Sequence, residues 1–200
     1  SDEKRDWTFH GHEVVGAKVT KRIMRDLKFP QDISDKVVAL VRWHMFFSDP
    51  DKITMSAVRR IIANVGRENV ADLLNLRICD RIGTGRPKEQ PFRLRKYMAM
   101  VEQALRDPVT VWMLALDGAE LMKQVGEKPG PRVGHMLHAL LEEVLEEPAR
   151  NTRETLSERA KQLSKLSDNQ LIQMGTSGRR KMEEVEADAV KDIEKKFWVD

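Results

Sequence analysis

Three side chains that can bind a divalent metal lie in the first half of the chain: His12, His44 and Asp80. Each stands three or four residues from an apolar residue of a predicted helix, and a helix brings such neighbours onto one face. The three polar groups would therefore point towards a shared interior. A buried imidazole or carboxylate is costly without a partner, and metal coordination would supply one.

The same residues also fit a structural interpretation without a metal. In it, Arg77 pairs with Asp80, three residues further along, and the two histidines bond to the backbone. A single histidine on an apolar face is most often satisfied by ordinary hydrogen bonds of this kind. From the residues alone we therefore favour the structural interpretation.

A glycine-proline turn in the second half is suited to binding an anion. Lys128-Pro129-Gly130-Pro131 separates two predicted helices, and Arg132 follows it. Pro131 suits the first position of a helix, where its missing N–H costs nothing. The open N–H groups of that helix, beside two cations, would attract phosphate, and glycine lets a phosphate backbone come close. The alternative is a helical hairpin whose glycines only allow tight crossing.

The elements that carry these residues are predicted to be helical. Aromatic residues make up only 6% of the chain, and stretches of alternating β-branched residues are absent. Val15, Val19, Ile23 and Leu27 recur every four residues, which predicts one face of a helix over residues 10–27. Caps, prolines and apolar spacing predict further helices over 54–64, 68–82 and 92–105. Other helices are predicted to start at Ser34 or Asp35, at Asp117 and at Pro131, the last of these ending before Pro148. A final helix is predicted to start at Thr155, with Asn151 and Thr152 as competing caps.

Composition limits the class of protein. Hydrophobic residues make up 40% of 200, which is enough for a core, and the net charge of +3 permits a nucleic-acid partner without requiring one. The single Cys79 excludes an internal disulfide framework, and no apolar run is long enough to predict a membrane span. The charged start lacks the apolar segment of a signal peptide and a methionine, so we expect a cytoplasmic protein and a piece of a longer chain.

The first half of the chain resembles a known family. The segments FHGHEVVGAKVTKRIMRDLKFP (9–30), VVALVRWHMF (37–46) and LLNLRICDRIG (73–83) carry the resemblance. Their order and spacing are similar to the HD-type helical region of bacterial tRNA nucleotidyltransferases and poly(A) polymerases. The resemblance implies a helical bundle at this end of the chain.

For the candidate metal ligands, the resemblance implies an incomplete set. HD phosphohydrolases bind metal through an upstream histidine, a His-Asp doublet and a later aspartate, and this chain has no His-Asp doublet. The resemblance implies His12 and His44 as accessory ligands and Asp80 as the later aspartate, with the main ligands before Ser1. Metal-dependent phosphohydrolysis by a degenerate HD-type domain is therefore the alternative function rather than the favoured one.

Residues 117–156 resemble the region that follows the HD part in the same family. They contain Gly-x-x-Leu-Met, Pro-Gly-Pro-x-x-Gly and Pro-x-x-Asn-x-x-x-x-Leu in the family's order. In that family this part supports tRNA mainly through contacts to its backbone, which position the RNA rather than read its bases. The resemblance thus implies tRNA as a partner and the following RNA-contacting residues: Lys128, Gly130, Arg132, Arg150 and Arg153. The last two could equally pair with Glu146, Glu147 or Glu154.

The groups that nucleotidyl transfer needs are missing from this sequence. The family's catalytic head uses a Gly-Ser loop for the triphosphate and two carboxylates for two Mg²⁺ ions. No Gly-Ser pair occurs here, and Asp49 and Asp51 flank Pro50 in a turn. The resemblance implies that Mg²⁺ and nucleoside triphosphates belong to an N-terminal nucleotidyltransferase domain of a longer parent. We expect this chain alone to be inactive and to hold no cofactor.

The expected architecture is all-α, with an HD-like helical bundle followed by a second helical body and a tail. The predicted boundaries are 1–106 for the partial HD-like domain, 107–166 for the RNA-binding body and 167–200 for the tail. Asp107-Pro108 marks the first boundary, because proline cannot continue a helix. We interpret Gly175 to Gly178 as the entry to a helix, and the mixed charges of 179–198 as a solvated helix, with an RNA-edge or dimer contact as the alternative.

Overall fold

The computed structural model describes residues 12–45, 53–85 and 91–177. Within these ranges every regular element is a helix, which confirms the predicted all-α fold, and no helix is long and apolar enough to cross a membrane. The elements are α1 His12–Asp26, α2 Gln31–Trp43, α3 Met55–Val65, η1 Arg67–Asn69, α4 Val70–Gly83, α5 Phe92–Ala104, η2 Val111–Met113, α6 Gly118–Val125, α7 Pro131–Glu146, η3 Pro148–Arg150 and α8 Arg153–Leu163, followed by a helix over 168–177.

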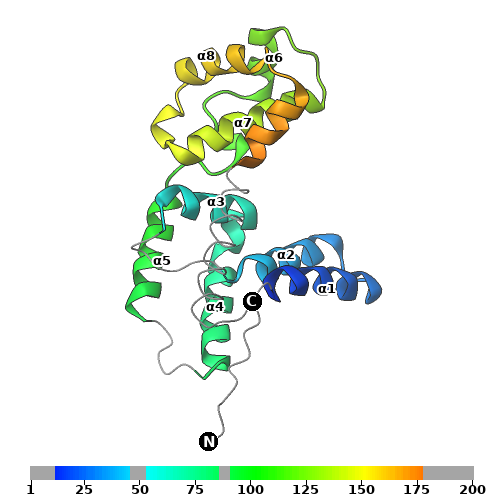
Figure 1. Cartoon of the computed structure of the whole chain (residues 1–200), viewed down its shortest axis with the longest axis vertical. Coiled ribbons are helices and arrows are strands. Elements are labelled where there is room, and N and C mark those ends of the chain that lie inside the picture. Colours follow the sequence, from blue (N-terminus) through cyan, green and yellow to red (C-terminus); the bar gives the residue numbers. More distant parts are fainter. Residues whose placement is uncertain (1–11, 46–52, 86–90, 178–200) are drawn as a thin grey trace, which may run out of the picture.

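The helices form two groups stacked along the long axis of the molecule (Figure 1). The lower group holds α1 to α5, and its α1–α2 pair extends to one side (Figure 1). The upper group holds α6, α7, α8 and residues 168–177. One cluster of buried residues runs through both groups, from Trp43 and Val58 in the lower to Leu140 and Leu171 in the upper. Contacts between α3 and α7 join them.

Local chemistry sets the ends of the helices in the upper group. The carboxylate of Asp117 accepts a hydrogen bond from the Glu120 N–H at 2.8 Å, so Asp117 caps α6 as the sequence predicts. α7 begins at Pro131 and ends at Glu146, before Pro148, as the sequence predicts. Of the competing caps of α8, Thr152 is the one used, because its hydroxyl accepts from the N–H of Thr155 at 3.3 Å.

The predicted start of α2 at Ser34 or Asp35 is wrong. The helix begins at Gln31, directly after Pro30, whose backbone is extended and which offers no side-chain cap. The hydroxyl of Ser34 instead donates to the carbonyl of Pro30 at 2.9 Å, one turn back along the chain. A serine inside a helix satisfies its hydroxyl in this way, so its presence alone does not mark a helix start.

The apolar stripe predicted on α1, every fourth residue from Val15 to Leu27, faces solvent. Its four side chains are 39–66% exposed, whereas Ala17 and Met24 of the same helix are buried. α1 packs against α2 alone in any extensive way, so only the side of α1 towards α2 is covered among the described residues. The spacing correctly indicated a helix, but not which face of the helix is covered.

Two adjacent arginines of α3 connect the two groups. The buried guanidinium of Arg59 donates to the backbone carbonyls of Leu145 at 2.6 Å and Glu146 at 3.0 Å. It also donates to a carboxylate oxygen of Asp107 at 3.0 Å. The last carbonyls of a helix have no partner within the helix, and its negative end favours a cation. Arg59 therefore closes the C-terminal end of α7.

Arg60 binds the side of the same helix end. Its guanidinium donates to Glu142 at 3.0 Å and to Glu146 at 2.8 Å. Burial lowers the pKa of Arg60, but the hydrogen bonds and charges of Glu146 and Glu142 outweigh burial, and the pKa lies above its ordinary value.

The predicted domain boundary at residues 106–107 lies beside the hydrogen bond between Arg59 and Asp107. The division into three domains stays a prediction.

Replacing Arg59 with alanine tests this contact. The two carbonyls and the carboxylate would lose a charged donor inside the protein, so we expect the free energy of unfolding to fall by about 3 kcal/mol. Urea denaturation of both proteins measures the change. Arg25→Ala is the control, because Arg25 lies exposed on α1, where it pairs with neighbouring Asp26. An unchanged midpoint for Arg59→Ala would contradict the role given to this side chain.

Candidate nucleic-acid interface

The turn before α7 lies at the surface. Gly126 ends α6 in the left-handed conformation, with φ of 71°, and its N–H bonds to the carbonyl of Met122. Lys128, Pro129 and Gly130 are all exposed. The first turn of α7 has no side-chain cap, unlike those of α3, α6 and α8. Open N–H groups at the positive end of a helix attract anions, so the predicted anion site is accessible.

Arg132 is bonded to other residues of this chain. Its guanidinium donates to the carbonyls of Ser164 and Leu166, both at 2.8 Å, and to Glu127 at 3.3 Å. It also pairs with Asp168, whose hydrogen bond is the main reason that the pKa of Arg132 is raised. Arg132 therefore clamps the start of α7 to the end of α8.

Two lysines lie beside this clamp. Lys128 precedes Arg132 by four residues, and Lys165 lies between the two residues whose carbonyls Arg132 binds. Both are exposed, and neither makes an ion pair with another described residue. Sequence reasoning missed Lys165, because it stands 37 residues from Lys128 and only the fold places it near the turn.

The other two predicted RNA contacts form ion pairs at the surface. Arg150 donates to Glu147 at 2.6 Å and lies 3.6 Å from Glu143, and Glu147 raises the pKa of Arg150. Arg153 pairs with Glu120 of α6. Both arginine side chains are at least half exposed, so water or an RNA phosphate can reach them.

The glycines of the turn do not mark a tight crossing. A Cβ at Gly134 would meet nothing within 4 Å, and one at Gly130 would meet only the carbonyl of Lys128, at 3.9 Å. Tight approaches lie elsewhere: a Cβ at Gly16 would come within 3.2 Å of Val41 on α2, and a Cβ at Gly175 within 3.2 Å of His138 on α7. The interpretation of Gly175 as part of a helix entry is wrong, because Gly175 lies inside the helix over 168–177. Gly178 lies outside the described residues.

The structure brings together two of the three candidate metal ligands. The Nε2 atoms of His12 and His44 are 3.2 Å apart, and Nδ1 of His44 bonds to the carbonyl of Val41 at 2.7 Å. Asp80 instead pairs with Arg77 at 3.2 Å. Across residues 12–45, 53–85 and 91–177, no three His, Cys, Asp or Glu side chains are grouped as metal binding requires. The Arg77–Asp80 pair and the backbone bond of His44 are those of the structural interpretation, whereas His12 contacts His44; the metal site stays a prediction.

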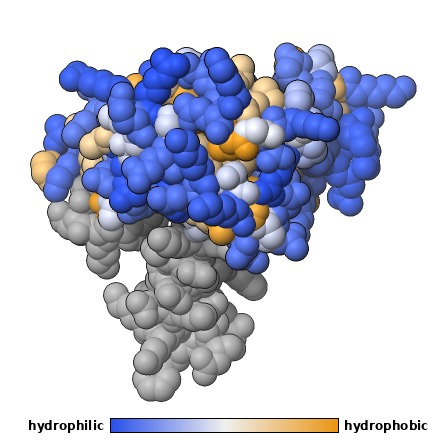
Figure 2. Space-filling view, turned by 90° about the horizontal axis from the view of Figure 1, so that it is seen from above, coloured by the Kyte–Doolittle hydropathy of each residue, from blue (hydrophilic) through white to orange (hydrophobic). Residues whose placement is uncertain are grey.

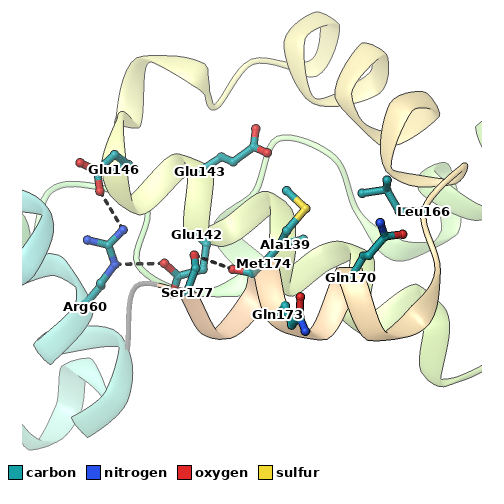
Figure 3. A pocket seen from close by; sticks show the side chains of 10 residues that line it. All are labelled: Arg60, Ala139, Glu142, Glu143, Glu146, Leu166, Gln170, Gln173, Met174 and Ser177. Carbon is teal, nitrogen blue, oxygen red and sulfur yellow. Dashed lines mark hydrogen bonds and ion pairs between the residues drawn. The ribbon is translucent and has the colours of Figure 1, made fainter. Parts of the chain in front are cut away.

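A cleft of about 550 Å³ lies between α3, α7 and the helix over 168–177 (Figure 3). Its polar lining includes Glu142, Glu143, Glu146 and Arg60, and Arg60 is bonded to two of these glutamates. Carboxylates repel phosphate, so this cleft does not suit an RNA backbone. Figure 2 views the molecule from the end that holds the upper group and shows a mainly hydrophilic face with small apolar areas between.

Comparison with known proteins identifies the family of the chain. Residues 1–160 match the model of the family described as tRNA nucleotidyltransferase domain 2. The chain belongs to this family. The resemblance drawn from the sequence motifs is therefore confirmed.

Two curated tRNA nucleotidyltransferases are similar to this family member. It is 36% identical over 138 residues to the A-adding tRNA nucleotidyltransferase of Deinococcus radiodurans, and the matched segment covers 68% of this chain and 31% of the relative. It is 32% identical over 134 residues to the CC-adding tRNA nucleotidyltransferase of Thermus thermophilus, covering 67% and 29%. The chain thus spans about a third of the length of these relatives. No solved structure matches it.

The role of Arg132 can be separated from that of Lys128 by thermal unfolding. Lysine in place of Arg132 keeps the charge but cannot bind two carbonyls and two carboxylates, so we expect Arg132→Lys to lower the Tm by about 3–6 °C. Lys128→Ala is the matched control, since Lys128 is exposed and its loss should leave the Tm unchanged. Equal Tm values for both variants would contradict the clamp.

Proposed function

We propose that this chain is the helical part of a CCA-adding-type tRNA nucleotidyltransferase that holds tRNA while a separate N-terminal catalytic head extends the RNA 3′ end. The observation that carries the proposal is the exposed, uncapped start of α7 with Lys128 and Lys165 beside it, in a chain of this family. The names of the relatives, one A-adding and one CC-adding, support tRNA as the substrate.

The described cations suit contacts to phosphate rather than to bases. Lys128 and Lys165 present single charges at the surface, and an RNA phosphate could also accept bonds from the open N–H groups of α7. Arg150 and Arg153 can exchange a glutamate for a phosphate at little cost, because exposed ion pairs contribute little stability. Such contacts fix the position of the RNA and carry no base sequence.

The metal ions of nucleotidyl transfer do not fit the described residues. Two Mg²⁺ ions need carboxylates that converge on them, and across residues 12–45, 53–85 and 91–177 no three His, Cys, Asp or Glu side chains are grouped so that they could hold a metal ion. We therefore assign Mg²⁺ and the nucleoside triphosphates to the catalytic head, and no catalytic step to this chain. The location that goes with this role is the cytoplasm, where tRNA matures.

Charge reversal at Lys128 and Arg153 tests the proposal. We expect the full 200-residue chain to bind tRNA in a salt-dependent manner. The double variant Lys128→Glu/Arg153→Glu should weaken binding roughly tenfold or more near 0.1 M salt, and lower the slope of log Kd against log salt by about 2, because two phosphate contacts are lost. Gel shifts at several salt concentrations measure both quantities.

The control variant reverses a charge on the other group of helices. Arg25→Glu changes the net charge by the same amount per site. Because Arg25 lies exposed on α1, away from the turn before α7, this variant should leave the slope of log Kd against log salt unchanged. Two results would sink the proposal: binding of tRNA no stronger than that of a neutral protein, or an equal loss of affinity for the control and the double variant.

A further inference from the structure

Trp112 in η2 carries the most exposed large hydrophobic side chain of the described residues. It is 77% exposed, compared with 69% for Phe92 and 66% for Leu27. An indole left in water forgoes the stabilisation that its burial would bring. A side chain placed in this way, on a turn that is otherwise well packed, is available for a partner.

The turn around Trp112 is held firmly in place. Val109 and Leu116 are fully buried on either side of it, and Leu114 is buried as well. The N–H of Met113 donates to the carbonyl of Thr110 at 3.0 Å, which closes the short 3₁₀ turn. The backbone that carries the indole is therefore fixed and does not need to be ordered when a partner binds, which lowers the entropic cost of contact.

Asn151 links this turn to the predicted RNA-contacting arginines. Its side-chain oxygen accepts from the N–H of Ala115 at 2.8 Å, and its side-chain nitrogen donates to the carbonyl of Met113 at 3.0 Å. Asn151 lies between Arg150 and the cap of α8, and Arg153 is the first residue of that helix. The turn of Trp112 and the two arginines thus share one framework.

A further cation lies next to the same turn. The guanidinium of Arg67 is 3.8 Å from the sulfur of Met113, the residue that follows Trp112. An aromatic face near cationic groups matches an unpaired nucleotide, because the base stacks on the ring while its phosphates meet the positive charges. A purely protein partner would need a wider apolar surface than one indole.

We propose that Trp112 is a stacking platform for an unpaired base of the bound RNA, with Arg67 contacting a phosphate beside that base. The proposal rests on the tRNA-holding function above and adds to it a contact that is not ionic. It makes Trp112 a binding residue that positions the RNA, and it predicts that single-stranded or looped nucleotides are the part of the RNA that meets this turn.

The salt dependence of binding separates stacking from charge. Loss of one stacked base corresponds to about a 5- to 100-fold weaker affinity. We expect Trp112→Ala in the full chain to weaken tRNA binding by that amount while the slope of log Kd against log salt stays unchanged. Trp112→Phe should stay within about threefold of the unmodified chain, because phenylalanine also stacks. Phe92→Ala is the matched control: an exposed aromatic, on α5, for which we expect no change.

Fluorescence gives an independent measurement. The chain has four tryptophans, and replacing Trp7, Trp43 and Trp198 with phenylalanine leaves Trp112 as the single reporter. We expect tRNA to reduce quenching of Trp112 by acrylamide. No protection, unchanged affinity of Trp112→Ala, or full affinity of Trp112→Leu, whose side chain is apolar but cannot stack, would each overturn the proposal.

The two proposals fail in different ways. If the unmodified chain binds no tRNA at any salt concentration, the tRNA-holding function falls and the stacking role falls with it. If the unmodified chain binds tRNA and the Lys128→Glu/Arg153→Glu variant does not, but Trp112→Ala binds like the unmodified chain, only the stacking role is wrong.

Discussion

The contact between Arg59, Arg60 and the C-terminal end of α7 is the interaction on which the rest of the structure depends. It joins residues 82 to 87 positions apart in the sequence, and it satisfies carbonyls that the helix itself leaves without partners. α7 has 16 residues and so is about 24 Å long. One end is held by the arginines of α3, and the other carries the turn with Lys128. The orientation of the cationic turn relative to α1–α5 therefore follows from this contact.

Sequence alone predicted those parts of the fold that depend on local chemistry. The cap at Asp117 and the start at Pro131 need only the residues within one turn, and both predictions are confirmed. The apolar spacing on α1 identified a helix but could not say what covers it, because periodicity describes one element and packing involves two. The start of α2 was missed since Ser34 offers the same hydroxyl inside a helix as at its cap.

The partners of charged side chains were beyond sequence reasoning. Arg132 was expected to contact RNA, yet two of its four acceptors are carbonyls more than 30 residues away, and no sequence pattern predicts a carbonyl as a partner. Trp112 lies in a three-residue turn, which is too short for a period that would show whether it points in or out. The pairing of Arg77 with Asp80 could be predicted, because three residues is helical spacing.

The cations of the upper group differ in how much stability the protein would lose if each one left its present partners. Among the described residues Arg153 pairs with Glu120, and exchanging this carboxylate for a phosphate would cost little stability, because exposed ion pairs contribute little. Arg132 has four acceptors, of which two are the carbonyls of Ser164 and Leu166 just after α8, so drawing it towards RNA would take this donor from those carbonyls. A surface that holds RNA in the proposed way and also stays folded without it would need both kinds of cation. Arg132 keeps the turn in shape, whereas Arg153 can exchange its glutamate, and Lys128 and Lys165 have no ion pair with another described residue to break.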